Sequence, residues 1–246
     1  ASIISQLPAS FGGAYQVTAG QGRMGQFAVL VLMFFLMIVG IIYVEQGQRR
    51  IPIQFAKRVR GRKVMGGQST YIPLKVNSAG VIPVIFATSV LFFPALIATS
   101  LPQDNRVTAG IRNWIDVNLA NSQGTSWFYI FFLGMLIIFF TYFYTTIQFD
   151  PVRQSDMIRR QGGFIPGVRP GISTTNYLSH IINRITLPGS VFLASVAVLP
   201  SIASAIWDIP LGFSGISILI TVGVALETMK QIESQLSMRN YEGFVD

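Results

Sequence analysis

The sequence contains no cysteine, a single histidine and few charged residues. Without cysteine, the chain has no disulfide bond and no thiolate for catalysis or metal binding. Only 11% of its 246 residues are charged, whereas a typical soluble domain has about 25%. Hydrophobic residues make up 51% of the chain, and the mean hydropathy is +0.53. Because a soluble fold of this composition would need a core too large for its surface, we predict a membrane protein.

Motifs for catalysis and for metal binding are also absent from the sequence. We find no G-x-S-x-G, H-E-x-x-H or Walker pattern. The one histidine, His180, has no partner motif, and we interpret it as a surface loop residue. The glycines of QGGFIPGVRPG do not have the spacing of a phosphate-binding loop, and we interpret this stretch as a structured turn. The sequence therefore predicts no enzyme, with no catalytic residue, no metal and no cofactor.

Five apolar segments are long enough to cross a bilayer, which requires roughly 20 mostly apolar residues. They are Gly25–Val44, Ala79–Ser100, Thr125–Phe149, Ile185–Trp207 and Ile209–Leu226. A tight turn around Asp208–Pro210 joins the last two as a helical hairpin, and the loops are residues 45–78, 101–124 and 150–184, with a tail at 227–246. The predicted fold is all-α and polytopic, with five transmembrane helices.

The start of the chain is predicted to be the end of an earlier element. Residues 1–24 combine an apolar stretch with a Gly-rich connection that we expect to be flexible. The chain begins at Ala1 and not at Met, and no basic signal region precedes the first apolar run. We therefore expect this start to be a cut or an incomplete beginning.

Lysine and arginine are concentrated on one side of the predicted spans. The loop after the first span holds eight, the loop 150–184 holds five and the tail holds two. The opposite side holds only Arg23, Arg106 and Arg112. By the positive-inside rule, this distribution predicts that both long loops and the C-terminus are cytoplasmic and that Ala1 lies outside.

The predicted spans contain no Asp, Glu, Lys, Arg or His. Ion-coupled transporters usually carry ionisable groups at membrane depth, and intramembrane proteases need paired Asp, Ser with His, or a metal cluster. The absence of such groups argues against both classes. Half of a secondary transporter remains an alternative, and so does a membrane scaffold that binds anionic lipid or RNA through the basic loops.

The first basic loop has a pattern of its own. Basic and apolar residues alternate from Arg49 to Phe55, which predicts a strand, and RVRGRKV predicts a hairpin tip at Gly61. The loop is longer than membrane topology requires, and long loops are usually functional. We therefore expect it to dock a partner with phosphates or an acidic surface, whereas the simpler interpretation is that its charges only fix orientation at lipid headgroups.

Several long stretches, in order along the chain, resemble one known family. QRRIPIQFAKR, STYIPLKVNSAGVIPVIFA, LFFPALIA, QGGFIPGVRPG and ITLPGSVFL are similar to the C-terminal half of the bacterial SecY family, the central subunit of the Sec protein-conducting channel. The resemblance runs from about Gly25 to Phe244. It implies that the five spans are helices six to ten and that residues 1–16 are the end of helix five with the external hinge. The N-terminal half, with the plug and one side of the lateral gate, has no counterpart here. Tyr71 stands where His is common in the family.

The resemblance identifies the span Ala79–Ser100 as a helix that borders the lateral gate. Pro83 falls in its first turn, where the missing N–H costs little, and Pro94 is expected to kink it. Helical spacing places Ile85, Thr88, Ser89 and Phe92 on one face. From spacing alone, this face could equally be ordinary helix packing. The resemblance implies a gate, and its predicted gate residues are Thr88, Ser89 and Phe93.

The resemblance also implies an apolar pore ring. Ile85 matches one ring position, and Ile220, in the stripe of Ser217, Gly223 and Val224, matches another. A ring of branched aliphatic side chains blocks ions because it offers them no hydration.

The resemblance implies partners for the basic loops. They are the SecA motor ATPase or a ribosome with its nascent chain, with SecE and SecG, anionic lipids and the N-terminal half of SecY completing the assembly. Signal sequences and unfolded polypeptides are the implied substrates, and the bacterial plasma membrane is the implied location. The predicted docking residues are Arg49, Arg50, Lys57, Arg58, Arg60, Arg62, Lys63 and Arg169.

Overall fold

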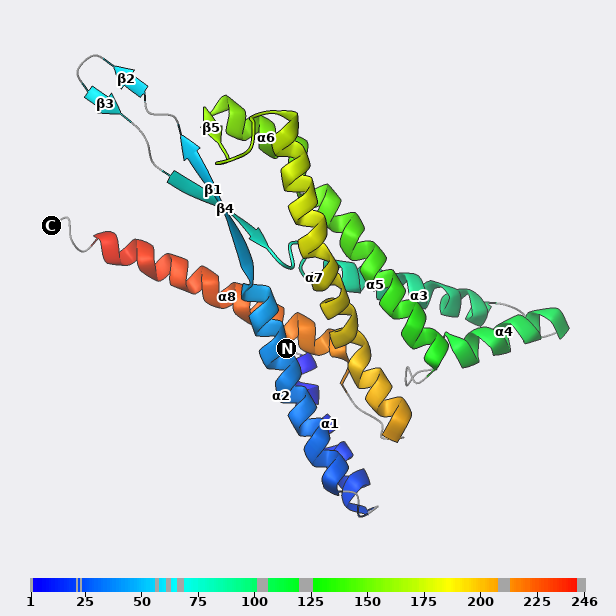
Figure 1. Cartoon of the computed structure of the whole chain (residues 1–246). Coiled ribbons are helices and arrows are strands. Elements are labelled where there is room, and N and C mark those ends of the chain that lie inside the picture. The colour runs from blue at the N-terminus through cyan, green and yellow to red at the C-terminus, as the bar shows by residue number, and fades with distance from the viewer. Residues whose placement is uncertain are drawn as a thin grey trace.

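The computed structural model describes residues 2–20, 22, 24–55, 58–60, 63–65, 69–100, 106–119, 126–207 and 213–242. The helices are α1 (Ser2–Gly20), α2 (Met24–Gln46), α3 (Ile82–Ser100), α4 (Arg106–Asn118), α5 (Trp127–Gln148), α6 (Pro151–Arg160), α7 (Ile172–Trp207) and α8 (Gly215–Glu242). The strands are β1 (Gln48–Phe55), β2 (Arg58–Arg60), β3 (Lys63–Met65), β4 (Ser69–Lys75) and β5 (Gly163–Phe164). Figure 1 shows their arrangement.

Five of the described helical segments are long and apolar enough to cross a membrane. They contain α2, α3, α5, α7 and α8. Their outer faces are apolar: Leu36 of α2 is 64% exposed and Phe131 of α5 is 70% exposed. Such a surface is stable in lipid, where a helix also satisfies its own backbone hydrogen bonds. The predicted all-α polytopic fold is confirmed, with the addition of short strands between α2 and α3 and after α6.

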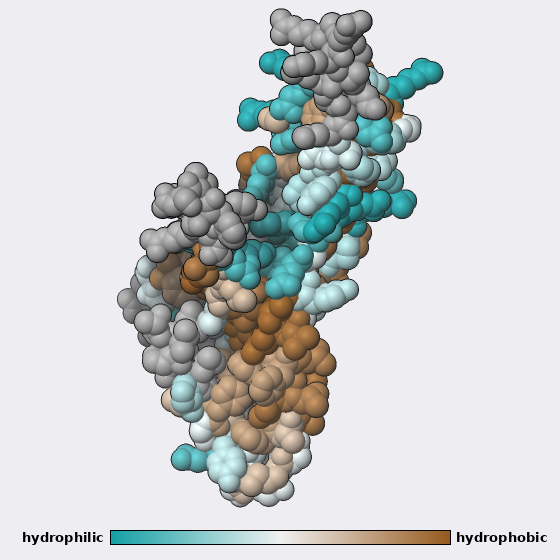
Figure 2. Space-filling view, turned by 90° about the vertical axis from the view of Figure 1, so that its left-hand side faces the viewer, coloured by the Kyte–Doolittle hydropathy of each residue, from teal (hydrophilic) through white to brown (hydrophobic). Residues whose placement is uncertain are grey.

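Hydrophilic and hydrophobic residues separate along the molecule. Figure 2 shows hydrophilic residues gathered at the end that carries the strands, whereas hydrophobic residues cover the helical part below it. This division matches one end in water and a body in lipid.

The helices differ in extent from the predicted spans. α3 begins at Ile82 because the preceding turn contains Gly80 with a positive φ of 64°. α7 already begins at Ile172, within the predicted loop, and α8 continues to Glu242, within the predicted tail. Hydropathy marks where the apolar part of a helix ends, but intrahelical hydrogen bonds continue past the bilayer. α7 and α8 therefore extend beyond the spans that their hydropathy predicts.

Two helices lie where connections were expected. α1 runs to Gly20, so the Gly-rich stretch that was expected to be a flexible connection is mostly helical. α4 occupies the middle of the predicted loop 101–124.

The longest helix, α7, lies at the centre of the bundle. In Figure 1, α5 and α3 lie on one side of it, and α8 and α2 lie on the other. Its core residues include Leu193, Val196 and Ala197, each about 2% exposed, which pack in one cluster with Ile137 of α5 and Leu219 of α8. α7 therefore holds the two sides of the bundle together.

Two glycines allow close approaches to α7. A Cβ on Gly189 would lie 2.7 Å from the carbonyl oxygen of Val76, in the turn between β4 and α3. A Cβ on Gly215, the first residue of α8, would collide with the carbonyl oxygen of Val196. These approaches fix α7 against the turn that precedes α3 and against the start of α8.

We expect Gly189→Ala to destabilise the protein. The added methyl group must displace a backbone carbonyl, and overpacking of this kind costs about 1–3 kcal/mol. Gly134→Ala in α5 is the matched control, because its Cβ would meet only Val198 Cγ2 at 3.9 Å. Thermal unfolding of the full-length protein in detergent should show a lower midpoint for Gly189→Ala only. Equal midpoints for the two variants would contradict the close approach.

Candidate functional site

The segment between α2 and α3 folds as a β-hairpin. β1 and β4 pair antiparallel, from Gln48 opposite Lys75 to Gln54 opposite Ser69. Ile51 and Ile53 are buried, whereas the residues between and beside them are exposed. The strand that the alternation of Arg49–Phe55 predicted is therefore confirmed. β2 and β3 also pair antiparallel, which confirms a second, distal hairpin, although its predicted tip at Gly61 lies outside the described residues.

The second basic loop is joined to this hairpin. β5 adds to the free edge of β1, with Gln54 opposite Phe164 and Phe55 opposite Gly163. A Cβ on Gly163 would lie 3.0 Å from side-chain atoms of Ile53 and Phe55, so the contact depends on glycine. The helix α6 leads into this strand. The Asp150 carboxylate caps the N-terminus of α6 by accepting hydrogen bonds from the backbone N–H of Val152 and of Arg153.

One apolar cluster holds these elements together. It consists of Ile51, Ile53, Leu74, Ile158, Ile165, Leu178, Ile181 and Ile182. These residues come from β1, β4, α6, the turn after β5 and the first turns of α7. We call this assembly the basic unit. The sequence analysis treated the two loops separately, and it missed their union because a strand of two residues has no detectable period.

The predicted docking residues are only partly described. Arg49, Arg50 and Arg169 are exposed on the basic unit. Lys57 and Arg62 lie outside the described residues. For Arg58, Arg60 and Lys63, only the strand backbone is described. The sequence analysis did not single out the exposed Arg153, Arg159 and Arg160 of α6, although their spacing on an amphipathic helix was a visible signal.

Two of the exposed arginines have a defined contact, Arg50 through its side chain and Arg169 through its backbone. The guanidinium carbon of Arg50 lies 4.9 Å from the ring centroid of Tyr71, on the solvent face of the hairpin, in the range of a cation–π contact. Arg169 lies in a turn between Gly167 and Gly171, both with positive φ, and its carbonyl oxygen accepts a hydrogen bond from the Thr174 hydroxyl. Both side chains are therefore presented from ordered backbone.

The basic unit is connected to α3 by a turn of residues 76–81. Asn77 in this turn is only 4% exposed, and its Nδ2 donates to Glu45 Oε2 over 3.0 Å and to the carbonyl oxygen of Gly80 over 3.2 Å. The backbone N–H of Val76 donates to the carbonyl oxygen of Gly47 over 3.0 Å. The end of α2, the end of β4 and the start of α3 are thereby joined at one place.

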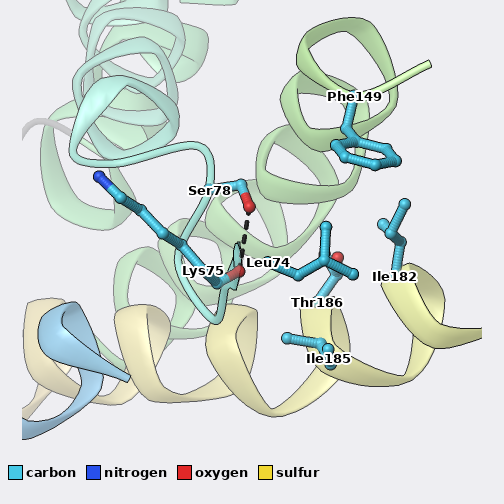
Figure 3. A pocket seen from close by; sticks show the side chains of 7 residues that line it. All are labelled: Leu74, Lys75, Ser78, Phe149, Ile182, Ile185 and Thr186. Atoms are coloured by element: carbon cyan, nitrogen blue, oxygen red, sulfur yellow. Dashed lines mark hydrogen bonds between the residues drawn. The ribbon is translucent and has the colours of Figure 1, made fainter. Parts of the chain in front are cut away.

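A small cavity lies beside this turn. Figure 3 shows it between the end of β4 and the helices α5 and α7, with the Ser78 hydroxyl donating to the carbonyl oxygen of Lys75 over 3.0 Å. Its volume is about 10 Å³, which is room for about one water molecule. Its lining residues are Leu74, Lys75, Ser78, Phe149, Ile182, Ile185 and Thr186. The cavity is a small gap where β4 packs against α5 and α7, and it is too small for a ligand larger than water.

The structure presents the predicted gate face of α3 to its surroundings. Ile85 is 46% exposed and Phe93 is 64% exposed; Ser89 is also exposed, and Thr88 is half-buried. The Thr88 hydroxyl donates to the carbonyl oxygens of Val84 and Ile85, and the Ser89 hydroxyl donates to that of Ile85. These hydroxyls are therefore satisfied within their own helix. The buried face of α3 consists of Pro83, Val84, Ala87, Leu91 and Ala98.

The second predicted ring residue, Ile220, lies on α8. Ile220 is half-buried on α8, next to the buried Ile218 and Leu219. α8 reaches the turn before α3, where a Cβ on Gly223 would lie 3.3 Å from Val81 Cγ2. Within the described residues, α3 and α8 do not pack along each other, and they diverge on opposite sides of α7 (Figure 1).

The fold and the site define a polytopic helical membrane protein with a folded basic unit at one end. A family model for SecY matches residues 1–229. The chain is 48% identical to "Protein translocase subunit SecY" of Streptomyces coelicolor over 245 residues, which covers 97% of this chain and 55% of that protein. It is 49% identical to the protein of the same name from Mycobacterium leprae over 227 residues, or 89% of this chain and 51% of that one. The chain therefore belongs to the SecY family.

Solved structures agree with this assignment at the level of fold. The one described as "The structure of a protein conducting channel" matches with a TM-score of 0.56 and 16% identity, over 96% of this chain and 56% of that chain. A second, on the plug domain of the SecY protein, matches with a TM-score of 0.54 and 15% identity. The chain spans about half the length of the curated relatives it matches.

We expect Asn77→Ala to loosen the basic unit from the membrane helices. The substitution removes two partly buried hydrogen bonds, one of them to a carboxylate, and a bond to a charged group contributes about 1.5–3 kcal/mol. Limited trypsin digestion of the full-length protein is a suitable measurement because the unit is rich in arginine. We expect cleavage there to accelerate about tenfold or more.

Ser78→Ala is the matched control for this experiment, because it removes a single neighbouring hydrogen bond, to the carbonyl oxygen of Lys75. Its digestion rate should stay near that of the unchanged protein. The same rate for both variants would show that the Asn77–Glu45 contact does not hold the joint.

Proposed function

We propose that this chain forms the C-terminal half of a protein-conducting channel in the bacterial plasma membrane. In this proposal, the basic unit and the C-terminus are cytoplasmic, and α3 is one side of a lateral gate through which signal sequences enter the lipid. Family membership supports the proposal, as do the motifs that resemble the C-terminal half. The chain has no catalytic role of its own in this reading. The observation that carries the proposal is the exposed face of α3.

A lateral gate needs a seam that opens at small cost. The Thr88 and Ser89 hydroxyls donate to carbonyl oxygens of α3 itself, so separating this face from a partner helix need not break any hydrogen bond of theirs. A gap of a few kcal/mol between closed and open states is small enough for a bound signal helix to shift the balance. Ser89 and Phe93 would contact the departing signal sequence.

The pore ring is a further part of the proposal. Ile85 projects from the exposed face of α3, and Ile220 lies half-buried on α8. With branched side chains from the other half, they would close a dry collar that excludes ions but makes few directional bonds. Such a collar closes around almost any passing side chain, which suits unfolded polypeptides as substrates.

The basic unit is the proposed docking site. Arg49, Arg50 and Arg169 would contact the SecA motor or a ribosome with its nascent chain, which supply the energy for transport. The other predicted contacts are Lys57, Arg58, Arg60, Arg62 and Lys63 of the distal hairpin. SecE, SecG and the N-terminal half of SecY would complete the channel, and anionic lipid would neutralise part of the remaining charge. Because β4 leads through Asn77 into α3, a partner that shifts the unit also biases the gate helix.

We expect a photo-crosslinking amino acid at Phe93 to capture a stalled signal sequence in the full-length channel. The same amino acid at Phe139 of α5 is the matched control, since the two phenylalanines are 64% and 61% exposed in spanning helices. A gate position should yield a crosslink several-fold stronger than a position that faces lipid alone. Equal crosslinking at both positions would exclude α3 as the gate, and a crosslinker at Ser89 provides a second gate position.

We expect Arg169→Glu to weaken binding of the motor or ribosome by roughly tenfold, because a charge-assisted contact becomes a repulsive one. Arg169→Lys keeps the charge and should retain most of the affinity. Both affinities should be measured at low and at physiological salt, since exposed charges are screened.

An unchanged affinity for Arg169→Glu would remove this residue from the docking site. If the protein instead bound RNA or anionic vesicles but neither partner, the scaffold function would replace the channel function.

A further inference from the structure

The helix α4, between the spans α3 and α5, exposes an apolar face. Ile111, Trp114 and Val117 are 48%, 51% and 65% exposed. Their spacing of three residues places them on one broad side of the helix. The other side carries an ion pair between Arg112 and Asp116, with 3.7 Å between the nitrogen and the oxygen. α4 is therefore amphipathic, and its apolar side is not covered by the described part of the chain.

The connections of α4 confine it to one membrane surface. Its 13 residues are about 20 Å long, too short for a hydrocarbon core of about 30 Å. α3 ends at Ser100 and α5 begins at Trp127, so both neighbours hold α4 where one span ends and the next begins. In Figure 1, α4 extends sideways from the start of α5 and does not continue its axis.

The three tryptophans of the chain lie at the same surface. Trp127 is the first residue of α5 and Trp207 is the last residue of α7, which runs antiparallel to α5. Trp114 belongs to α4 itself. Tryptophan is enriched at the boundary between lipid headgroups and hydrocarbon. The position of α4 therefore coincides with a membrane boundary that two other tryptophans mark independently.

The apolar face of α4 is continuous with the outer face of α5. The Trp114 ring lies 5.5 Å from the Phe128 ring, and Phe128 stacks on Phe132 at 5.9 Å. Phe131, beside them, is 70% exposed. A row of exposed aromatic side chains on a spanning helix faces lipid, and Trp114 extends this row onto α4.

We propose that α4 is an interfacial helix whose face of Ile111, Trp114 and Val117 is buried in the lipid headgroup region. The Arg112–Asp116 pair then faces water, as the polar side of an interfacial helix does. The ligand of this surface is the lipid bilayer itself. The helix anchors the end of α3 to the membrane surface, and the proposal does not depend on the channel function.

Spin labels in reconstituted full-length protein test this proposal. The described chain offers a cysteine-free background, and any cysteine in the rest of the protein would be replaced by serine. Single labels are introduced through Ile111→Cys and Val117→Cys on the apolar side. Asp116→Cys is the matched control, because Asp116 is an exposed residue on the polar side of the same helix. Collisions with oxygen report lipid, and collisions with a water-soluble nickel chelate report water.

We expect the labels at Ile111 and Val117 to collide several-fold more with oxygen than with the nickel chelate, relative to the label at Asp116. A label at Phe139 on α5 provides the reference for full lipid exposure. Nickel collisions as frequent at Ile111 and Val117 as at Asp116 would show that the face lies in water. Protection from both reagents would show a protein partner on this face. Either result would overturn the proposal, and neither depends on whether the channel transports protein.

Discussion

The arrangement depends on one crowded contact between α7 and the turn of residues 76–81. The carbonyl oxygen of Val76 occupies the space where any side chain at Gly189 would begin. Asn77 fixes the same turn to Glu45 at the end of α2. A buried polar group that loses its partner is costly, and a backbone carbonyl in a packed interior cannot move far. The turn, α2 and α7 are therefore fixed relative to one another. Because α3 begins directly after this turn, the position of its first residue is fixed as well.

This contact determines how a movement of the basic unit is transmitted to the membrane helices. A flexible linker would let the basic unit move without effect on the membrane helices. Here β4 ends at Lys75 and α3 begins at Ile82, and the short turn between them is bonded on both sides. The same unit shares its apolar cluster with the first turns of α7. Any displacement of the unit must therefore be accommodated at the starts of α3 and α7.

The sequence predicted the features that have a strong local signal. Long apolar runs indicated the five spans, and the alternation of Arg49–Phe55 indicated β1. The sequence analysis did not predict the amphipathic α4, because its charged residues give it the hydropathy of a loop. The sequence analysis also did not predict that β5 joins the two basic loops, because pairing between distant segments leaves no local pattern. The roles of Ile85 and Ile220 came from resemblance, and their relative position depends on α7, which separates α3 from α8.

The chemistry of the exposed faces distinguishes lipid contacts from contacts with a partner. A chain that spans about half the length of its relatives can expose both kinds of surface, so exposure alone does not separate them. The outer face of α5 is apolar and mostly aromatic, with Phe131, Phe139 and Phe143 at least half exposed. The exposed face of α3 places Ser89 between apolar side chains. The Ser89 hydroxyl donates within its own helix and so needs no outside partner, and small polar residues of this kind are typical of faces that meet another helix. The aromatic row of α5, and α4 with it, has the composition of a lipid-facing surface, whereas the mixed face of α3 fits the proposed contact with another helix or a passing polypeptide.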